Sequence, residues 1–303
     1  MKSVRELLKI SEQDATESIE GYMRELVSKH NASHALIGLS GGIDSAVLAT
    51  LAVRTLGKDR VKVFYFYNGR GDEVARKSAK LMADWLCLRL TIVPIESIMG
   101  VKITRSSFLK ILDKSPTLTR FLQNLYCLLF GETPFITTMR KEEFMTNWFR
   151  RLVYDSLVKD LETSFDGWFI EIRGYLEALA EKNNTIILGG GNYTELSSGW
   201  FTKGGLDDMP YSPIGKLYKT QINQLAEYLE IPEEIRDRAS SADVLCGTSD
   251  ELALGISYDK LDAILYGIEH GLNDENIMDY DVTKKEIKKV REMNRLAIRK
   301  KLS

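Results

Sequence analysis

Short apolar runs alternate with segments of helical periodicity along the first hundred residues. The runs predict buried strands at residues 34–39, 61–67 and 89–95. The periodic segments predict helices at residues 14–30, 44–56 and 73–86. Because strands that alternate with helices form parallel sheets, the pattern predicts an α/β fold.

The alternation stops between residues 97 and 165, where leucines and phenylalanines recur at helical spacing and no strand pattern is visible. We interpret this stretch as a helical insertion. Its end and the residues that follow carry aromatic side chains that the spacing places in a core, at Trp148, Phe149, Tyr154, Phe165, Trp168 and Phe169. The α/β pattern resumes with a helix at 169–181 and a strand at 185–188. Further helices are expected at residues 219–229, 257–266 and 283–301. With no internal repeat and no linker, residues 1–303 are expected to form a single domain that carries the insertion.

Composition narrows the class of protein. Of 303 residues, 44% are apolar and 28% are charged, which excludes a disordered or low-complexity chain. The 41 basic and 43 acidic residues give a net charge of −2, so a nucleic-acid partner is not expected. No apolar run approaches membrane-spanning length, and the first residues lack the apolar core of a signal peptide. Three widely spaced cysteines, Cys87, Cys127 and Cys246, favour a reducing compartment, and we expect a cytoplasmic protein.

A glycine- and serine-rich turn follows the first predicted strand directly. It reads Ser40-Gly41-Gly42-Ile43-Asp44-Ser45 and leads into a predicted helix. Open α/β sheets bind ligands at the carboxyl ends of their strands, and backbone amides at a helix N-terminus favour phosphate groups. Asp44 would repel a phosphate unless a divalent cation lay between them. The turn therefore predicts a site for a pyrophosphate group and Mg²⁺.

This turn resembles the pyrophosphate loop of the N-type ATP pyrophosphatases, which cleave ATP between its α and β phosphates. Blocks in the C-terminal half, in matching order, resemble ammonia-dependent NAD synthetases, and the resemblance covers roughly residues 15–95 and 170–290. The blocks are Phe201-Thr202-Lys203, Pro213-Ile214-Gly215-Lys216-Leu217-Tyr218-Lys219-Thr220-Gln221, Ser241-Ala242-Asp243 and Gly247-Thr248-Ser249-Asp250-Glu251. The resemblance implies a doubly wound parallel sheet of the adenine nucleotide α-hydrolase-like class.

The resemblance also implies a role for each matching residue. The implied ATP-binding residues are Gly38, Leu39, Ser40, Gly41, Gly42, Asp44, Ser45 and Ser249. Asp44 and Glu195 would bind the metal ion and, together with Lys203, form the catalytic group. The implied residues for the acid substrate are Arg173, Lys203, Asp207 and Asp208. A homodimer is implied as well.

Several positions depart from the pattern of the family. Gly189-Gly190 stands where the family usually has Gly-Thr, and Arg238-Ala239-Ser240 stands where it has Lys-Pro-Pro. Lys203 is followed directly by two glycines instead of Tyr-Gly-Asp, and Arg173 is what is left of an arginine-rich helix. These departures concern the acid-substrate side more than the pyrophosphate loop.

The resemblance implies an ATP-dependent amide ligase. It would adenylate a carboxylate, most simply that of deamido-NAD, and amidate it with ammonia to give NAD, AMP and pyrophosphate. Two alternatives remain open at this point. One is a sulfurtransferase that uses Cys246, and the other is a catalytically altered nucleotide-binding paralogue.

Overall fold

Four parallel strands form the sheet on which the site is built. They are β1 (His34–Gly38), β2 (Val61–Tyr67), β3 (Leu90–Pro94) and β4 (Thr185–Leu188). The sheet order is β3-β2-β1-β4, and Ala35 of β1 pairs with Val61 on one side and Ile186 on the other. This computed structural model describes residues 2–67, 73–98, 107–112, 114–241 and 247–302. The predicted α/β fold on a parallel sheet is confirmed, and each predicted strand differs from the observed one by no more than one residue at either end.

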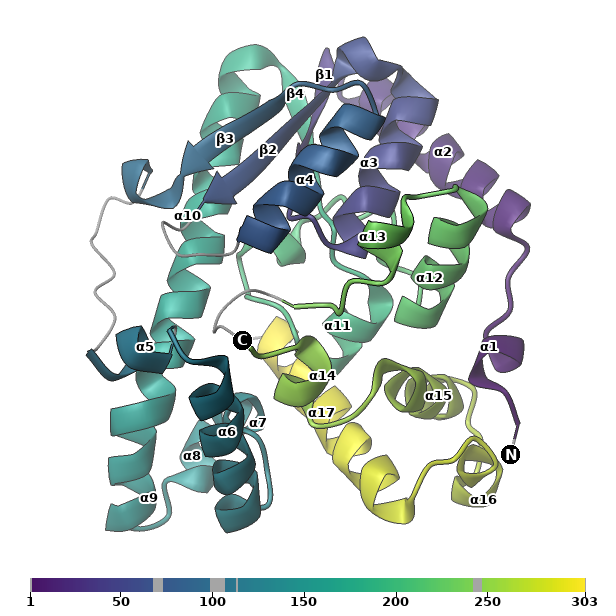
Figure 1. The fold of residues 1–303 in the computed structure, drawn as a ribbon. Helices are drawn as coiled ribbons and strands as arrows, with labels where there is room; N and C mark the ends of the chain where they lie inside the picture. Colours follow the sequence, from purple (N-terminus) through teal and green to yellow (C-terminus); the bar gives the residue numbers. More distant parts are fainter. Residues whose placement is uncertain (1, 68–72, 99–106, 113, 242–246, 303) are drawn as a thin grey trace.

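Helices cover both faces of the sheet, as a doubly wound fold requires (Figure 1). Ala35 and Ile37 of β1 face one core, and Leu36 between them faces the other, because successive side chains of a strand point to opposite faces. The first core is shared with α2 (Glu12–Lys29), α3 (Ile43–Leu56), α4 (Glu73–Trp85) and α12 (Lys219–Tyr228). The second is closed by Trp168, Ile172 and Leu176 of α10 (Lys159–Asn183).

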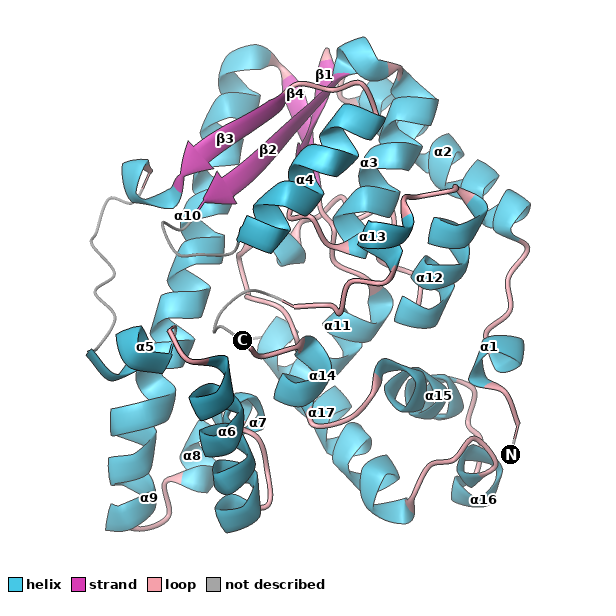
Figure 2. Ribbon diagram, in the orientation of Figure 1, coloured by secondary structure: helices cyan, strands magenta, loops and turns pink. Residues whose placement is uncertain are grey.

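The described part of the insertion contains helices and no strand (Figure 2). These are α5 (Ser107–Leu112), α6 (Pro116–Phe130), α7 (Pro134–Met139), α8 (Lys141–Phe144), α9 (Trp148–Val153) and a π-helical turn, η3 (Tyr154–Val158). They lie beyond the sheet, along the lower half of α10 (Figure 1). The helix α10 thus packs against the sheet at one end and supports the insertion at the other.

The insertion differs from the expected core in one respect. Tyr154 and Trp168 are buried as predicted, but Trp148 and Phe149 are exposed, so their assignment to the core was wrong. Phe165 lies in a part of α10 whose side chains are outside the description. The helix α6 buries polar as well as apolar side chains, and several of its large apolar side chains are exposed. It buries Thr119, Gln123 and Tyr126 and exposes Leu118, Phe121, Leu125, Leu128 and Leu129.

A second helical layer below the sheet completes the molecule. It contains α11 (Tyr193–Ser198), α14 (Asp250–Leu254), α15 (Tyr258–Glu269), α16 (Asp274–Met278) and α17 (Lys284–Leu302). The short elements are α1 (Val4–Leu7), α13 (Glu233–Arg236), η1 (Lys58–Arg60), η2 (Ile95–Ser97) and η4 (Leu206–Asp208). Within the described ranges, none of these helices combines the length and the apolar character needed to cross a bilayer.

Candidate active site

The strand order creates a switch point beside β1. From β1 the chain continues to β2 and β3 on one side, whereas β4 adds on the other side. The loops that follow β1 and β4 therefore leave the same edge of the sheet in adjacent positions, where open α/β sheets form their ligand crevice. The turn over residues 39–42 and the turn over residues 189–192 are these two loops.

The turn after β1 is held by its own serines and by α4. The hydroxyl of Ser45 donates to the carbonyl of Gly42 (3.0 Å) and accepts from the amide of Ser40 (3.2 Å). Gly41 adopts φ +81°, and a Cβ there would collide with the carbonyl oxygen of Ala75 and lie 2.9 Å from the amide nitrogen of Ala79. Only glycine fits this position, because both the dihedral angle and the space exclude a side chain.

The helix α3 begins at this turn without a side-chain cap in the described structure. Its N-cap is Gly42, which has no side chain to bond the first-turn amides. These amides and the positive end of the helix dipole therefore face the crevice, an arrangement that favours a phosphate group. Leu39 is fully buried, so it can contribute only its backbone.

Two carboxylates and one ammonium group meet at the switch point. Asp44, in the first turn of α3, accepts a hydrogen bond from Asn192 Nδ2 (2.7 Å) and forms an ion pair with Lys219 Nζ. Glu195 lies 3.8 Å from the same Lys219 nitrogen. Glu195 is also the third residue of α11 and forms a capping box with Asn192. The predicted pair of Asp44 and Glu195 is thus brought together from β1 and β4.

Lys219 is the residue that the sequence interpretation missed. Its side chain is 3% exposed, compared with 17% for Asp44 and 14% for Glu195. The ammonium group lies 5.0 Å from the ring centroid of Tyr258, whose hydroxyl donates to Asp250 Oδ2 (3.0 Å). Lys219 lies inside a block quoted for the family resemblance, and it begins a predicted helix. A lysine at the start of a helix is unfavourable for the helix dipole, and this could have indicated a special role.

The cluster of Asp44, Glu195 and Lys219 contains more carboxylates than ammonium groups. Burial, followed by the charge of Asp44, raises the pKa of Glu195 well above its usual value. Burial and the charges of Asp250 and Asp44 raise the pKa of Asp207 to about 7. Burial opposes the charge of Lys219, but Asp44 and Glu195 outweigh it and raise the pKa of this lysine. The cluster can therefore accept further positive charge.

A buried aspartate fixes the helices that carry these groups. Asp262 of α15 accepts from the backbone amide and the hydroxyl of Thr220 (both 2.7 Å) and from the hydroxyl of Thr194. The hydroxyl of Thr194 in turn accepts from the amide of Lys219 (2.9 Å). Because these bonds join the first turns of α11 and α12, they set the distance between Glu195 and Lys219.

The other predicted residues surround this cluster at greater remove. Arg173 on α10 donates to the carbonyl oxygen of Asp208 (3.1 Å) and pairs with Glu177. The carboxylate of Asp208 accepts from the amide of Gly204 (3.0 Å). Lys203 is exposed, and among the described residues the ion pairs of Asp44 and Glu195 are with Lys219 and not with Lys203. Ser249 caps α14 by accepting from the amide of Leu252.

Cys246 lies outside the described residues. The departure at Arg238 has a structural role, because its guanidinium donates to the carbonyl oxygen of Gly41 (3.0 Å) and so contacts the turn after β1. The departure at Gly190 leaves open space, since a Cβ there would meet no atom within 4 Å. Among the described residues, no three His, Cys, Asp or Glu side chains converge as a metal cluster.

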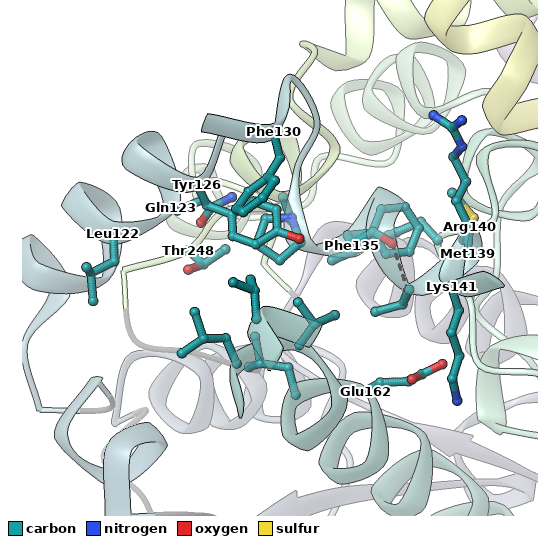
Figure 3. Close-up of a pocket in the computed structure, with 18 of the residues that line it drawn as sticks. Leu122, Gln123, Tyr126, Phe130, Phe135, Met139, Arg140, Lys141, Glu162 and Thr248 are labelled. Carbon is teal, nitrogen blue, oxygen red and sulfur yellow. Dashed lines mark hydrogen bonds between the residues drawn. The ribbon is translucent and has the colours of Figure 1, made fainter. Parts of the chain in front are cut away.

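A cavity of about 550 Å³ lies between the insertion and the segment before Lys203 (Figure 3). Its walls are mainly apolar and come from α6, α7 and α10, with Trp200 and Phe201 on the side of the catalytic domain. Gln123 and Thr248 lie at one end of the cavity, and Lys141 and Glu162 lie at the other (Figure 3).

Comparison with known proteins agrees with this geometry. The profile of the family described as NAD synthase matches residues 15–113 and 172–301, which is most of the chain. The chain belongs to the NAD synthase family. The resemblance seen in the sequence and the assignment of the chain as a ligase are thereby confirmed. The residues that the profile leaves out, 114–171, fall largely in the insertion.

Individual relatives match over nearly their whole length. The NH(3)-dependent NAD(+) synthetase of Coprothermobacter proteolyticus is 32% identical over 87% of this chain and 88% of its own. The NH(3)-dependent NAD(+) synthetase of Thermotoga maritima is 31% identical over 92% of this chain and 94% of its own.

Solved structures share the fold. NMN synthetase from Francisella tularensis superposes with a TM-score of 0.66 at 21% identity, over 97% of each chain. The NH3-dependent NAD synthetase of Campylobacter jejuni gives a TM-score of 0.63 at 20% identity, over 94% of each chain.

Proposed function

We propose that this ligase adenylates the carboxylate of deamido-NAD with ATP and then amidates it with ammonia, releasing AMP and pyrophosphate. The observation that carries the proposal is the convergence of Asp44, Glu195 and Lys219 at the switch point, beside the uncapped start of α3. Charge neutralisation and positioning are what adenylation demands, and no strong general base is needed once the acyl-adenylate has formed.

The turn after β1 would hold the ATP phosphates. The amides of Gly41, Gly42 and the first turn of α3 and the hydroxyl of Ser40 are the donors that a pyrophosphate requires, while Ser45 holds the turn through its bond to the Gly42 carbonyl. Gly38 and Leu39 shape the backbone of this loop, and Ser249 would approach from α14. Lys219 would neutralise phosphate charge that develops as pyrophosphate leaves.

The donor set fits Mg²⁺. This ion binds proteins through one or two carboxylates and takes further oxygens from substrate phosphates. Asp44 and Glu195 would hold it, and their mutual repulsion, seen in the raised pKa of Glu195, would be relieved by it. When bound, Mg²⁺ supplies charge neutralisation on the phosphates.

The acid substrate would lie on the side of the insertion. Trp200 and Phe201, which precede Lys203 directly, form one wall of the 550 Å³ cavity. Arg173, Asp207 and Asp208 belong to the same side, where the backbone between Gly204 and Asp208 is fixed by Arg173. We infer that Lys203 points its charge toward the acid or the phosphates once these are bound. The insertion would then compensate for the shortened loop after Lys203.

Product analysis tests the function. Incubation with ATP, Mg²⁺, ammonia and deamido-NAD should yield NAD, AMP and pyrophosphate. A parallel incubation with the deamido form of NMN separates two acids, because the Francisella tularensis protein of similar fold is an NMN synthetase. Release of ADP and phosphate would contradict the adenylation step. No amide product from either acid would contradict the substrate proposal and favour a sulfurtransferase or a catalytically altered paralogue.

We further propose that the chain acts as a cytoplasmic homodimer. The helices α6 and α9 expose large apolar side chains, at Phe121, Leu128, Trp148 and Leu152. Large apolar side chains left exposed on two helices of one insertion favour an interaction site. A second copy presenting the same face would bury it in an isologous contact.

A further inference from the structure

Two side chains of the insertion helix α6 form hydrogen bonds to the backbone of residues 247–252, which include the start of α14. Arg120 Nε donates to the carbonyl oxygen of Gly247 (2.9 Å), and Gln123 Nε2 donates to the carbonyl oxygen of Leu252 (2.7 Å). Gln123 and Thr248 both line the cavity and are drawn toward the same end of it in Figure 3. Two side chains of one helix therefore hold both ends of residues 247–252.

The fit at Gly247 leaves no space for a side chain. Gly247 adopts φ +82°, and a Cβ there would lie 2.6 Å from Pro116 Cβ and 2.8 Å from Pro116 Cα. The first turn of α6 therefore rests directly on the backbone of this segment. At the other end of α14, Lys289 donates to the carbonyl oxygen of Gly255 (2.9 Å), so the segment is fixed from two directions.

The amide of Gln123 is buried at this contact. Gln123 is 9% exposed and lines the cavity together with Leu122 and Tyr126 of the same helix. Burying an amide costs free energy unless its hydrogen bonds are satisfied. Gln123 is satisfied by the Leu252 carbonyl, and that bond fixes the rotation and position of one element relative to the other.

The segment from residue 247 to residue 252 contains Asp250, which lies next to the candidate active site. Asp250, the first residue of α14, is buried and accepts a hydrogen bond from Tyr258, whose ring faces the Lys219 ammonium. A shift of α14 would move Asp250 and disturb its hydrogen bond to Tyr258, the first residue of α15, beside Lys219. The path from α6 to the catalytic cluster is therefore a short chain of direct contacts.

We propose that Arg120 and Gln123 are positioning residues, which hold α14 where Asp250 and Tyr258 complete the surroundings of Lys219. Both residues lie in the part of the insertion that the NAD synthase profile does not match, so this device belongs to the insertion. The effect that we expect on the kinetics rests on the proposed function, whereas the contact between α6 and α14 does not.

Hydrogen–deuterium exchange tests the contact without any reaction. In Arg120→Met/Gln123→Met, which keeps side-chain volume and removes both donors, the amides of residues 252–256 should exchange at least about fivefold faster. Gln13→Met, on the exposed face of α2, is the matched control and should leave this exchange unchanged. Unchanged exchange in the double variant would overturn the inference, whether or not the chain makes NAD. If the double variant fails to fold, the two single variants carry the same test.

Steady-state kinetics then separates positioning from a merely structural role. In the double variant, the altered surroundings of Lys219 should raise the KM for ATP about fivefold and leave the KM for ammonia unchanged. Arg120→Lys keeps a hydrogen-bond donor and should therefore keep most of the affinity for ATP. A fall in kcat alone, with both KM values unchanged, would show loss of folded protein and overturn the positioning role. An inactive wild-type chain would instead contradict the proposed function, and the exchange experiment would still decide the contact.

Discussion

At the scale of single residues, the site depends on the balance between one ammonium group and several carboxylates. Lys219 is nearly buried, pairs with Asp44 and lies close to Glu195. Such a group can neutralise phosphate charge without moving, because its partners already fix it. Asp44 and Glu195 lie in the first turns of two different helices, so the proposed metal site depends on both elements. The consequences of changing each are therefore different.

We expect Lys219→Met to reduce the rate of AMP formation at least about hundredfold, because a preorganised charge is lost from the leaving phosphates. Asp44→Asn and Glu195→Gln should each cost a similar factor, because each removes charge from the proposed metal site. Rates are measured under saturating Mg·ATP, and circular dichroism checks folding. Lys216→Met, an exposed lysine three residues away, is the control and should keep the wild-type rate. Near-wild-type rates in any of the three variants would remove that residue from the site.

The raised pKa of Asp207 predicts how the free energy of unfolding changes with pH. Burial, together with Asp250 and Asp44, raises its pKa to about 7, whereas an unfolded aspartate ionises near pH 4. Between these values the folded state holds a proton that the unfolded state has lost, so this group lowers the free energy of unfolding as the pH rises. Asp207→Asn cannot ionise and should gain up to about 4 kcal/mol of stability relative to wild type between pH 4 and pH 8, from roughly three pKa units at about 1.4 kcal/mol each. Urea denaturation at both pH values measures this, and an identical difference at both would contradict it.

At the scale of elements, close approach of backbones decides which turns tolerate a side chain. The turn after β1 is pressed against α4, and Gly41 stands at the contact with a positive φ. Gly21, in the middle of α2, has no atom within 4 Å of a Cβ and an ordinary helical position. Replacement by alanine is therefore expected to lower the stability of the protein at Gly41 and to raise it at Gly21.

We expect Gly41→Ala to destabilise the protein by about 2 to 4 kcal/mol, through the collision with Ala75 and the strained dihedral angle. Gly21→Ala should stabilise it by about 0.5 to 1 kcal/mol, because alanine loses less backbone entropy in a helix. Chemical denaturation gives both values, and ATP binding should be weakened only in the first variant. Equal effects of the two substitutions would contradict the close packing of the turn on α4.

At the scale of the whole molecule, the insertion contacts the rest of the chain on one side and exposes apolar side chains on the other. Gln123 of α6 bonds to α14, whereas Phe121 and Leu128 of α6 and Trp148 and Leu152 of α9 are exposed. A monomer would leave these side chains in water, at a cost in free energy that grows with the apolar area.

Leu128→Glu should therefore convert the proposed dimer to a monomer, because it places a charge in the apolar contact. Leu302→Glu on α17 is the matched control, since the two leucines are 81% and 83% exposed. Sedimentation velocity at several protein concentrations measures the oligomeric state of both. A monomeric wild-type chain, or a dimer that survives Leu128→Glu, would contradict this use of the face.

The sequence by itself determined the strands, most of the helices, the glycine- and serine-rich turn after the first strand, and the family. These features depend on local periodicity and on contiguous motifs such as the one from Ser40 to Ser45, which a chain displays in order. It also singled out Asp44 and Glu195 as candidates, because each lies in such a motif. The tertiary structure decided what depends on distant segments. It brought Lys219 between the two carboxylates, linked Asp262 to two helices, and placed Arg238 on the turn after β1. It also left Trp148 and Phe149 exposed, because apolar spacing predicts a helix but does not say which neighbour will cover its apolar side.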